Sequence, residues 1–407
     1  MIRRIRLFYA VPDFFPGWRL DVGHLFGEQL AERGLDITWA MWRDKAGPFA
    51  RTELHGQRVF LPRAFGKNGT VRRLLTGLAR ILFDTTLLLE LLAGRRFDII
   101  QVRDRRYLIA FLAWLAARLR GARFTYWLSY PFPEHYLELS RTGHGIKRAF
   151  QWLQGITSFW FVYRWLVHRA DHIFVQSEQM KRDLAAYGAQ VEKMTPVPMG
   201  VPPALLEWSS RERAVTVPGR IVYMGTLARV RRLETLIEAF VRVAACAPNA
   251  ALVIVGQGDT PSDRAFLEAE ARRLGISDKV SFTGFVPMEE AWRHAASAEV
   301  CLSPFYPTFV LRSTSPTKLY EYMALGRPVV ANDHPEQSVT LAESQAGLCV
   351  PWGATSFAEA ILWLLEHPHE AEEMGKRGPD WVATNRTYDK IAPLVYARYQ
   401  ALAGGAF

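Results

Sequence analysis

The sequence contains little that could bind a metal ion or form disulfide bonds. It has only three cysteines among 407 residues, Cys246, Cys301 and Cys349, and no two of them form a CxxC pair. No group of His, Asp and Glu has the spacing of a metal site either. We therefore expect a reduced, cytoplasmic chain that binds no metal and has no resident cofactor.

Long apolar runs are also missing. A transmembrane helix needs about 20 mostly apolar residues, whereas the aromatic stretch at residues 150–167 is interrupted by two glutamines, a glycine and an arginine. Two interpretations of this stretch stay open: an amphipathic segment at a membrane surface, or a buried helix packed on a sheet. Residues 81–93 are expected to form an ordinary core helix. The charged N-terminus has too short an apolar stretch for a signal peptide and is expected to form the first strand.

Acidic residues are scarce in the first half of the chain. Residues 1–205 hold 30 Lys and Arg against 17 Asp and Glu, a net charge of +13, while the remainder has a net charge of −3. Of these 30 basic residues 25 are Arg, which suits phosphate recognition. The asymmetry indicates an anionic partner for the first half. Nucleic acid is disfavoured because no nucleic-acid motif is present, which leaves an anionic membrane surface, on the inner face of the membrane, or a pyrophosphate-bearing substrate.

Short β-rich runs alternate with helical stretches along the whole chain, which is typical of a parallel, doubly wound sheet. The alternation restarts at residue 219, after five prolines in residues 196–218. We predict an α/β protein with two Rossmann-like domains that face a central cleft, with ligands at the carboxyl ends of the strands. The expected divisions are residues 1–200, a linker at 201–218, residues 219–385, and a C-terminal helix at 386–407 that crosses back to the N-terminal domain.

Basic residues gather at the start of one helix in the second half. Gly225 and Thr226 form a turn after a strand, and Arg229, Arg231 and Arg232 follow on the N-terminal side of the helix. Because a helix N-terminus already carries partial positive charge, cations are unfavourable there unless an anion is bound. Backbone N–H groups and guanidinium groups together suit a diphosphate. The alternative is a solvated basic face.

Residues 311–333, LRSTSPTKLYEYMALGRPVVAND, predict a hydroxyl-rich loop, a short helix that stops at Gly326, and a buried strand. Lys318 is again a cation near a helix N-terminus, and Glu321 lies about one turn later on the same side. A carboxylate in that place can accept two hydrogen bonds from a vicinal diol such as ribose. The alternative for Glu321 is a solvent-exposed helix acid. Two other strand-end turns, at Gly256-x-Gly258 and at Gly284, also permit close approach of a ligand to the backbone.

In this order and spacing, these segments resemble the C-terminal domain of GT-B glycosyltransferases of family 4, which are retaining, metal-independent enzymes that use nucleotide sugars. Arg231 falls at the family's lysine, and Glu321 at the glutamate that holds the ribose. The family's Ala-x-Gly-x-Pro-Val-Val motif is present at residues 324–330. Ser313 replaces the glutamate that contacts the donor sugar, which leaves the identity of the sugar open. The variant SPTKLYEYMALGRPVV is similar to a branch active in bacterial surface-polysaccharide and lipid-linked saccharide assembly.

The resemblance and the strand-end positions give three sets of expected site residues. The expected catalytic residues are Arg231, Lys318, Glu321, Tyr130 and His135. The expected donor-binding residues are Gly225, Thr226, Arg229, Arg232, Gly256, Gly258, Gly284, Phe285, Ser313, Thr314, Ser315 and Leu319. The expected acceptor-binding residues are Gly17, Trp18, Arg103, Asp104 and Glu134.

The function that the resemblance implies is transfer of a sugar, with retention, from a UDP- or GDP-linked donor to a saccharide or lipid-linked acceptor in cell-surface polysaccharide or glycolipid biosynthesis. Two alternatives remain open. One is a nucleotide-sugar epimerase of the same fold, which would need no acceptor. The other is a non-catalytic, membrane-bound subunit of a polysaccharide assembly complex.

Overall fold

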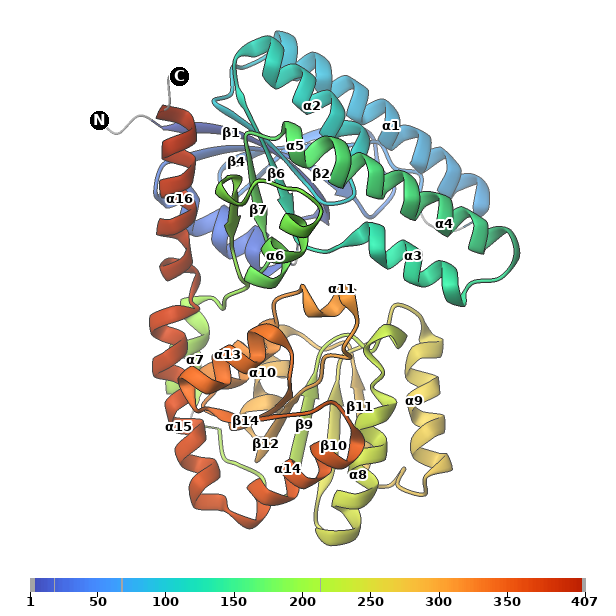
Figure 1. Cartoon of the computed structure of the whole chain (residues 1–407), viewed down its shortest axis with the longest axis vertical. Helices are drawn as coiled ribbons and strands as arrows, with labels where there is room; N and C mark the ends of the chain where they lie inside the picture. Colours follow the sequence, from blue (N-terminus) through green and yellow to red (C-terminus); the bar gives the residue numbers. More distant parts are fainter. Residues whose placement is uncertain (1–3, 18, 67–68, 213, 405–407) are drawn as a thin grey trace. The chain divides into compact units, whose positions relative to one another are not determined.

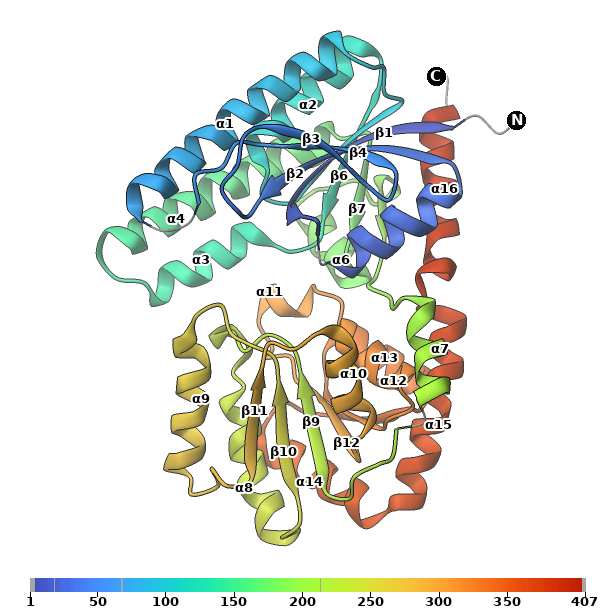
Figure 2. The same cartoon turned by 180° about the vertical axis from the view of Figure 1, so that it is seen from behind.

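The computed structural model describes residues 4–17, 19–66, 69–212 and 214–404, which form two compact units. Unit 1 comprises Met1–Pro198 and Tyr388–Phe407, and unit 2 comprises Met199–Thr387. The C-terminal helix α16 (Tyr388–Gly404) therefore belongs to unit 1, where it lies beside the π-helix η1 (Asp21–Leu30) in Figures 1 and 2.

The predicted linker at residues 201–218 is not a linker in the structure. Its prolines start a helix, α7 (Pro203–Glu212), because proline fits the first position of a helix, where its missing N–H is not needed. Leu205 of α7 is fully buried in the core of unit 2. Val201 also donates its N–H to the carbonyl of Arg386 at 2.8 Å, within the same unit.

Unit 1 is built on an eight-stranded sheet with the order β3-β4-β2-β1-β5-β6-β7-β8. All neighbouring pairs are parallel except β3 and β4. The strands are β1 (Ile5–Phe15), β2 (Leu35–Arg43), β3 (Ala50–Leu54), β4 (Gln57–Leu61), β5 (Ile99–Arg103), β6 (Arg123–Leu128), β7 (His172–Val175) and β8 (Met194–Pro196). The β3–β4 hairpin was not predicted, because both strands are only five residues long and β3, at the edge of the sheet, is largely polar.

Helices cover both faces of this sheet. On one face the core is formed with α1 (Thr70–Ala93), α2 (Tyr107–Arg120), the π-helix η2 (Trp160–Leu166) and α6 (Glu178–Ala186). On the other face it is formed with η1 and α16. The remaining helical segments of unit 1 are α3 (Phe132–Thr142), α4 (Gly145–Phe159), α5 (Val167–Arg169) and the short 3₁₀ turn η3 (Val191–Lys193).

Unit 2 is built on a six-stranded, fully parallel sheet with the order β11-β10-β9-β12-β13-β14. Its strands are β9 (Arg220–Met224), β10 (Ala251–Val255), β11 (Val280–Gly284), β12 (Val300–Ser303), β13 (Val329–Asn332) and β14 (Gly347–Val350). Besides α7, its helices are the 3₁₀ turn η4 (Arg229–Arg231), α8 (Glu234–Cys246), α9 (Pro261–Arg273), α10 (Met288–Ala296), α11 (Phe309–Arg312), α12 (Thr317–Ala324), α13 (Pro335–Ser344), α14 (Ala354–Glu366) and α15 (Pro368–Asn385).

The prediction of two Rossmann-like domains is confirmed. In each sheet the strand order reverses beside the first strand, at β1 and β5 in unit 1 and at β9 and β12 in unit 2. Ligands of doubly wound sheets bind at such reversal points, outside the carboxyl ends of the strands. The predicted helix, stop and strand at residues 317–332 are also present: α12 ends before Gly326, whose φ of 69° is accessible to glycine, and β13 follows.

Residues 81–93 do form a helix that packs in the core, through Phe83, Leu87 and Leu91. They are only the second half of the 24-residue α1, however, and the apolar residues before Phe83 are not buried. Within the aromatic stretch at residues 150–167, much of η2 packs in the core, as the buried-helix interpretation predicts, whereas α4 is largely exposed. The membrane-surface interpretation of α4 stays a prediction. Among the described residues, no helix combines the length and the hydrophobicity needed to cross a bilayer.

Candidate functional site

Three glycines form tightly packed turns at the carboxyl ends of neighbouring strands in unit 2. Gly225, Gly256 and Gly284 follow or end β9, β10 and β11, with φ values of 148°, 132° and 74°. Gly256 donates its N–H to the carbonyl of Gly284 at 3.0 Å. A Cβ on Gly256 would lie 2.1 Å from the carbonyl oxygen of Gly225, so no larger residue fits. The turns therefore present bare backbone at the point where a ligand of this fold binds.

The loop after β10 is held over the start of α9. A Cβ on Gly258 would lie 2.3 Å from that of Asp263, whose carboxylate accepts the N–H of Thr260 at 2.8 Å and so caps the helix. Thr226 and Phe285, at the neighbouring turns, are exposed. Glycine is thus needed at position 258 to bring the loop close to a helix N-terminus.

Lys318 is a buried cation beneath the β9 turn. It extends from α12 and donates from Nζ to the hydroxyl of Tyr223 at 3.1 Å, with its Nζ 5.3 Å from the centroid of the Phe305 ring. Burial, reinforced by nearby Arg231, holds the pKa of Lys318 well below its usual value, while Glu321 acts in the opposite direction. Within the described part of the chain, Lys318 forms no ion pair with an acid.

Arg231 is the second cation at this place. It lies in η4, with its guanidinium carbon 5.6 Å from the centroid of the Phe305 ring. Its Nη1 is buried and has no hydrogen-bond partner among the described residues. A buried donor without an acceptor is costly, and two neighbouring cations repel each other. Both penalties disappear when an anion binds between Arg231 and Lys318.

The other two arginines of the predicted cluster lie elsewhere. The guanidinium of Arg229 stacks on the ring of Phe266 in α9, 3.3 Å from its centroid. Arg232 is exposed and forms an ion pair with Glu234 at 3.2 Å. Of the three arginines expected to bind the diphosphate, only Arg231 therefore approaches Lys318. Arg229 is held by Phe266 of α9, and Arg232 by Glu234 of α8.

Glu321 is not a solvent-exposed helix acid, because α12 is packed on all sides and leaves this side chain only 9% exposed. Its Oε1 accepts a hydrogen bond from the indole N–H of Trp292 in α10 at 3.3 Å. Burial raises the pKa of Glu321 to about 7, against the opposing effects of Trp292 and Lys318. An ionised carboxylate has room for several more hydrogen bonds, so Glu321 can still bind hydroxyl groups.

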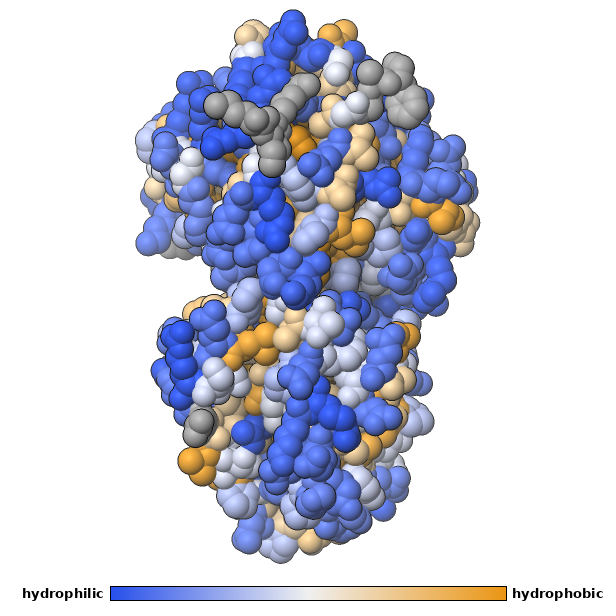
Figure 3. All heavy atoms as spheres, turned by 90° about the vertical axis from the view of Figure 1, so that its left-hand side faces the viewer, coloured by the Kyte–Doolittle hydropathy of each residue, from blue (hydrophilic) through white to orange (hydrophobic). Residues whose placement is uncertain are grey.

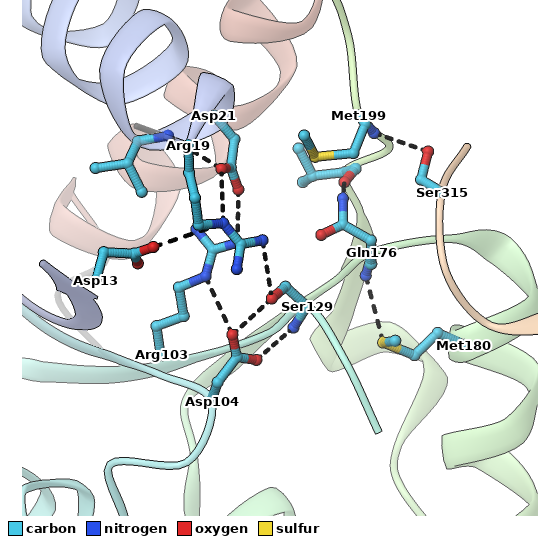
Figure 4. Close-up of polar contacts among 12 residues, drawn as sticks. Asp13, Arg19, Asp21, Arg103, Asp104, Ser129, Gln176, Met180, Met199 and Ser315 are labelled. Atoms are coloured by element: carbon cyan, nitrogen blue, oxygen red, sulfur yellow. Dashed lines mark hydrogen bonds and ion pairs between the residues drawn. The ribbon is translucent and has the colours of Figure 1, made fainter. Parts of the chain in front are cut away.

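The hydroxyl-rich loop is used differently from what we predicted. Ser313 and Thr314 donate to the carbonyls of Phe309 and Leu311 at 3.1 and 2.7 Å, which closes α11. Ser315 donates to Glu336 at 3.0 Å. It also accepts the N–H of Met199 at 2.9 Å (Figure 4). These hydroxyls build the loop between α11 and α12 instead of pointing to a sugar.

Leu319 is also placed differently from the prediction. Its side chain is fully buried in the core of unit 2, because it lies on the inward face of α12. Any contact with a donor would therefore be made by its backbone.

In unit 1, a buried network of charged groups joins the carboxyl ends of β1, β5 and β6 (Figure 4). Arg103 is fully buried, with its Nη2 2.6 Å from Asp21 and its Nε 3.2 Å from Asp104. Asp104 in turn accepts the N–H and the hydroxyl of Ser129 at 2.7 and 2.6 Å. Arg103 and Asp104 were expected to contact the acceptor, but both side chains are buried, and the one contact of this pair with Ser129 is made by Asp104.

Arg19 closes this network from the loop after β1. Its Nε lies 3.4 Å from Asp21 and 3.7 Å from Asp13, and it donates to the hydroxyl of Ser129 at 3.4 Å. Burial acts to raise the pKa of Asp21, but Arg103 and Arg19 together bring it below its usual value. Asp21 is therefore ionised at neutral pH.

The other predicted residues of unit 1 fall into separate places. Tyr130 and His135, after β6, are in contact, with the tyrosine oxygen 3.2 Å from Nδ1 of the histidine. Glu134 instead faces the interior, where it accepts a hydrogen bond from Tyr163 at 2.7 Å, and burial raises its pKa to about 7. Gly17 lies in the turn after β1 with a φ of 84°, and Trp18 lies outside the described residues.

Sequence reasoning missed the residues that hold the functional groups. Lys318 is contacted by Tyr223, and Glu321 by Trp292. In unit 1, Ser129 is contacted by Arg19, and Arg103 by Asp21. The position of Tyr223 near the end of a strand was the one available signal. The other contacts join residues that are distant in the sequence.

Comparison with known proteins bears on both units. Residues 24–200 match the sequence model of a family described as "Glycosyl transferase 4-like domain", and residues 218–367 match that of "Glycosyl transferases group 1". The chain carries two glycosyltransferase domains of the GT-B fold.

Individual relatives and solved structures agree with this assignment. The chain is 29% identical over 232 residues to a GDP-mannose-dependent alpha-(1-6)-phosphatidylinositol monomannoside mannosyltransferase of Mycobacterium tuberculosis, covering 54% of this chain and 58% of that protein. It is 26% identical over 322 residues to a 2-deoxystreptamine glucosyltransferase of Streptomyces kanamyceticus, covering 75% and 78% of the two chains. The fold matches a sucrose-phosphate synthase of Thermosynechococcus elongatus with a TM-score of 0.73 at 18% identity, over 98% of this chain and all of the other.

The two glycosyltransferase domains carry different parts of the candidate site. The group 1 domain in unit 2 holds the paired cations, Glu321 and the glycine turns, which together suit a nucleotide diphosphate. The 4-like domain in unit 1 holds the charged network around Ser129 and the contact between Tyr130 and His135.

Proposed function

We propose that this protein is a retaining glycosyltransferase of family 4 that transfers a sugar from a nucleotide-diphosphate sugar to a saccharide or lipid-linked acceptor. The observation that carries the proposal is the pair of Lys318 and Arg231, two neighbouring cations. Lys318 is buried, and the half-buried Arg231 has one buried donor without an acceptor among the described residues. A diphosphate supplies the missing negative charge and the missing hydrogen-bond acceptors.

The donor fits the group 1 domain in one orientation. With its diphosphate at Lys318 and Arg231, the ribose hydroxyls would reach Glu321, one helical turn further along α12. The nucleobase would then pair with exposed backbone at the turn of Gly284 and Phe285. Ser313 stands where related enzymes carry a sugar-binding glutamate, but its hydroxyl closes α11, so the identity of the sugar stays open in this proposal.

The reaction that we propose needs charge stabilisation more than a protein base. The bond between the anomeric carbon and the diphosphate oxygen breaks, and the negative charge that develops on the diphosphate is stabilised by Lys318 and Arg231. The acceptor hydroxyl attacks from the same face as the leaving group, which retains the anomeric configuration. Its proton passes to a phosphate oxygen of the departing diphosphate. Because side chains supply the positive charge, this scheme needs no metal ion.

The acceptor is proposed to bind the 4-like domain beside Tyr130 and His135. Relatives include enzymes named for mannosyl transfer to a phosphatidylinositol mannoside, for rhamnosyl transfer and for amylovoran biosynthesis. Structures of similar fold contain UDP or UDP-glucose. We therefore keep both GDP- and UDP-linked donors in the proposal, and place the reaction in cell-surface polysaccharide or glycolipid biosynthesis.

A thermal-shift panel of GDP- and UDP-sugars tests the donor site, since a ligand that binds the folded state raises its stability by about 2.7 kcal/mol at 100 times its dissociation constant. We expect Arg231→Ala to abolish the shift and Arg232→Ala, the removal of an exposed and ion-paired neighbour, to preserve it. Equal shifts in both variants would refute the assignment of the diphosphate site.

Turnover distinguishes the rival activities. A labelled donor incubated without acceptor should remain chemically unchanged apart from slow hydrolysis, whereas an epimerase would change its sugar. Release of the free nucleoside diphosphate when membranes or a lipid-linked acceptor are added would exclude a non-catalytic subunit. Failure to release it with any acceptor class would count against the transferase.

A further inference from the structure

Two helices of unit 1 expose a line of apolar side chains along one face. On α4 and the first residue of η2, the exposed apolar residues at helical spacing are Ile146, Phe150, Leu153 and Trp160. On α1 they are Val71, Leu75, Leu78, Leu82 and Leu89. Ile146 is 91% exposed and Phe150 64%, values far from those of core residues. We refer to these two lines as the α4 stripe and the α1 stripe.

Both helices project in the same direction beyond α2. Arg106, which precedes α2, contacts Asp84 in the second half of α1. Tyr107, the first residue of α2, packs its ring against Phe161 of η2 at 5.8 Å. The parts of α1 before Asp84 and of α4 before Phe161 therefore extend past the start of α2, as Figures 1 and 2 show. The two stripes lie on the same side of the sheet, where α1, α2 and η2 share one core.

The projecting parts of both helices contain basic but no acidic side chains. No acidic residue occurs between Glu138 and Asp171, or between Glu53 and Asp84. The two acids of α1 lie further along the helix, where Asp84 is buried against Arg106 and Glu90 is paired with Arg51. The exposed basic residues on the two projecting helices are Arg72, Arg73, Lys147 and Arg148. Lys and Arg beside an apolar line are typical of helices that lie in the interface of an anionic bilayer, with the apolar residues below and the charges near the headgroups.

A groove between α3 and α4 opens beside the α4 stripe. It encloses about 520 Å³ and is lined by Leu137, Ser140, Arg141, Arg148 and Trp152, together with small residues of α4. Two guanidinium groups above apolar walls fit a phosphate attached to a lipid, because guanidinium groups bind phosphate oxygens in a fork geometry. Trp152 and Trp160 are both exposed, and tryptophan is enriched at membrane interfaces.

We propose that the α1 and α4 stripes form a docking surface for an anionic phospholipid bilayer, with Arg141 and Arg148 holding a lipid phosphate in the α3–α4 groove. The proposal does not depend on the sugar transfer proposed above. A bilayer is favoured over a protein partner because two projecting apolar ridges, whose projecting parts carry only basic charges, match a fluid, negatively charged surface. The face that carries α16, by contrast, is mostly hydrophilic, with its apolar residues in small separate groups (Figure 3).

Co-sedimentation of the full chain with vesicles tests the docking surface. We expect binding to phosphatidylcholine vesicles that contain phosphatidylglycerol, and much weaker binding to phosphatidylcholine alone. The stripe variant carries Phe150→Ser and Leu153→Ser. Its matched control carries Leu394→Ser and Val339→Ser, two apolar residues that are 55% and 56% exposed elsewhere. The stripe variant should lose binding by at least tenfold, and the control should bind as the wild type does.

The charges are tested in the same assay. Lys147→Gln with Arg148→Gln should lower binding to the anionic vesicles about 25-fold, since each basic residue near such a surface contributes about fivefold. Arg272→Gln with Arg293→Gln removes the same charge from exposed positions in unit 2 and should have little effect. Added salt should weaken the binding of the wild type.

Three results would overturn the proposal. One is equal binding to neutral and anionic vesicles, and another is a stripe variant that binds as well as its control. The third is light scattering that shows a dimer which the stripe variant disrupts, with no vesicle binding by the wild type. That result would make the stripes an interface between two copies of the chain. All substituted residues are exposed, so every variant should fold. An unfolding temperature equal to that of the wild type would exclude misfolding as the cause of lost vesicle binding.

Discussion

Replacing Glu321 by glutamine keeps the shape of the side chain but removes its charge, and it tests whether this carboxylate binds the donor in its ionised form. Burial raises the pKa of Glu321 to about 7. Only the ionised form can accept a hydrogen bond from each of two ribose hydroxyls with both oxygens. Donor affinity in the wild type should therefore fall as the pH drops below 7.

The size of the effect follows from the fraction of ionised Glu321. With a pKa of about 7, the dissociation constant rises about 11-fold at pH 6 and about 100-fold at pH 5, relative to its value at high pH. Hydrogen bonds to a charged group contribute about 1.5–3 kcal/mol, so Glu321→Gln should bind about 10- to 150-fold more weakly than the wild type at pH 8. This advantage of the wild type should shrink about tenfold for each pH unit below 7, until the two proteins bind equally.

Isothermal titration calorimetry with a nucleotide sugar at pH 5 to 8 measures both proteins. The ratio of their dissociation constants isolates Glu321, because Lys318 is present in both and the phosphates of a nucleotide sugar do not titrate in this range. A ratio that is independent of pH would refute the reasoning, and so would a wild type that binds no better than the variant at pH 8.

Stability of the unliganded protein supplies an internal check on the same substitution. A carboxyl with a folded-state pKa of about 7 and an ordinary value of 4.5 binds more protons when folded between these pH values. Stability is then lost as the pH rises through this window, by up to about 3 kcal/mol. Glu321→Gln should therefore be more stable than the wild type at pH 8, and equally stable near pH 4.

Three other substitutions test the remaining buried charges. Lys318→Met should leave the unfolding temperature unchanged or raise it, because it removes a buried cation without an ion pair, yet lower donor affinity at least tenfold in the same titration. Glu134→Gln should raise the unfolding free energy at pH 8 by up to about 3 kcal/mol in urea denaturation, since burial raises the pKa of Glu134 to about 7 from 4.5; no gain at pH 8 would contradict this. Arg103→Met should cost about 3–5 kcal/mol in the same assay, because it leaves Asp104 buried without its cation and Asp21 with Arg19 alone; a loss under 1 kcal/mol would show that the network is not needed for folding.

Much of the architecture could be predicted because local patterns are consistent with it. Strand β13 is a β-branched run that follows a glycine stop, and α2 ends at Gly121, whose φ is 67°. Such signals lie within a few residues of one another, so they can be read without knowledge of the fold. The order of strands and helices then follows from the alternation, since parallel strands need helical crossovers between them.

The helix α1 shows where this reasoning ends. Its apolar residues predict a helix, and a helix is present, but the sequence does not state which side of it will be covered. Only Phe83, Leu87 and Leu91 among its apolar residues are buried, because the helix extends beyond the sheet and beyond α2. Whether a residue of α1 is exposed depends on how far the sheet and α2 extend beside it. That distance is set only when the whole unit has folded.

The sequence by itself determined the fold class, the glycines at the strand ends and the places along the chain where cations and Glu321 occur. Only the tertiary structure decided which of these groups meet. Lys318 contacts Tyr223 across 95 residues of sequence, Trp292 contacts Glu321 across 29, and Arg229 is drawn away to Phe266. These pairings depend on the order of the strands and on which helix packs beside which. The free energy that sets that order comes from burial of whole faces and cannot be read from any short segment.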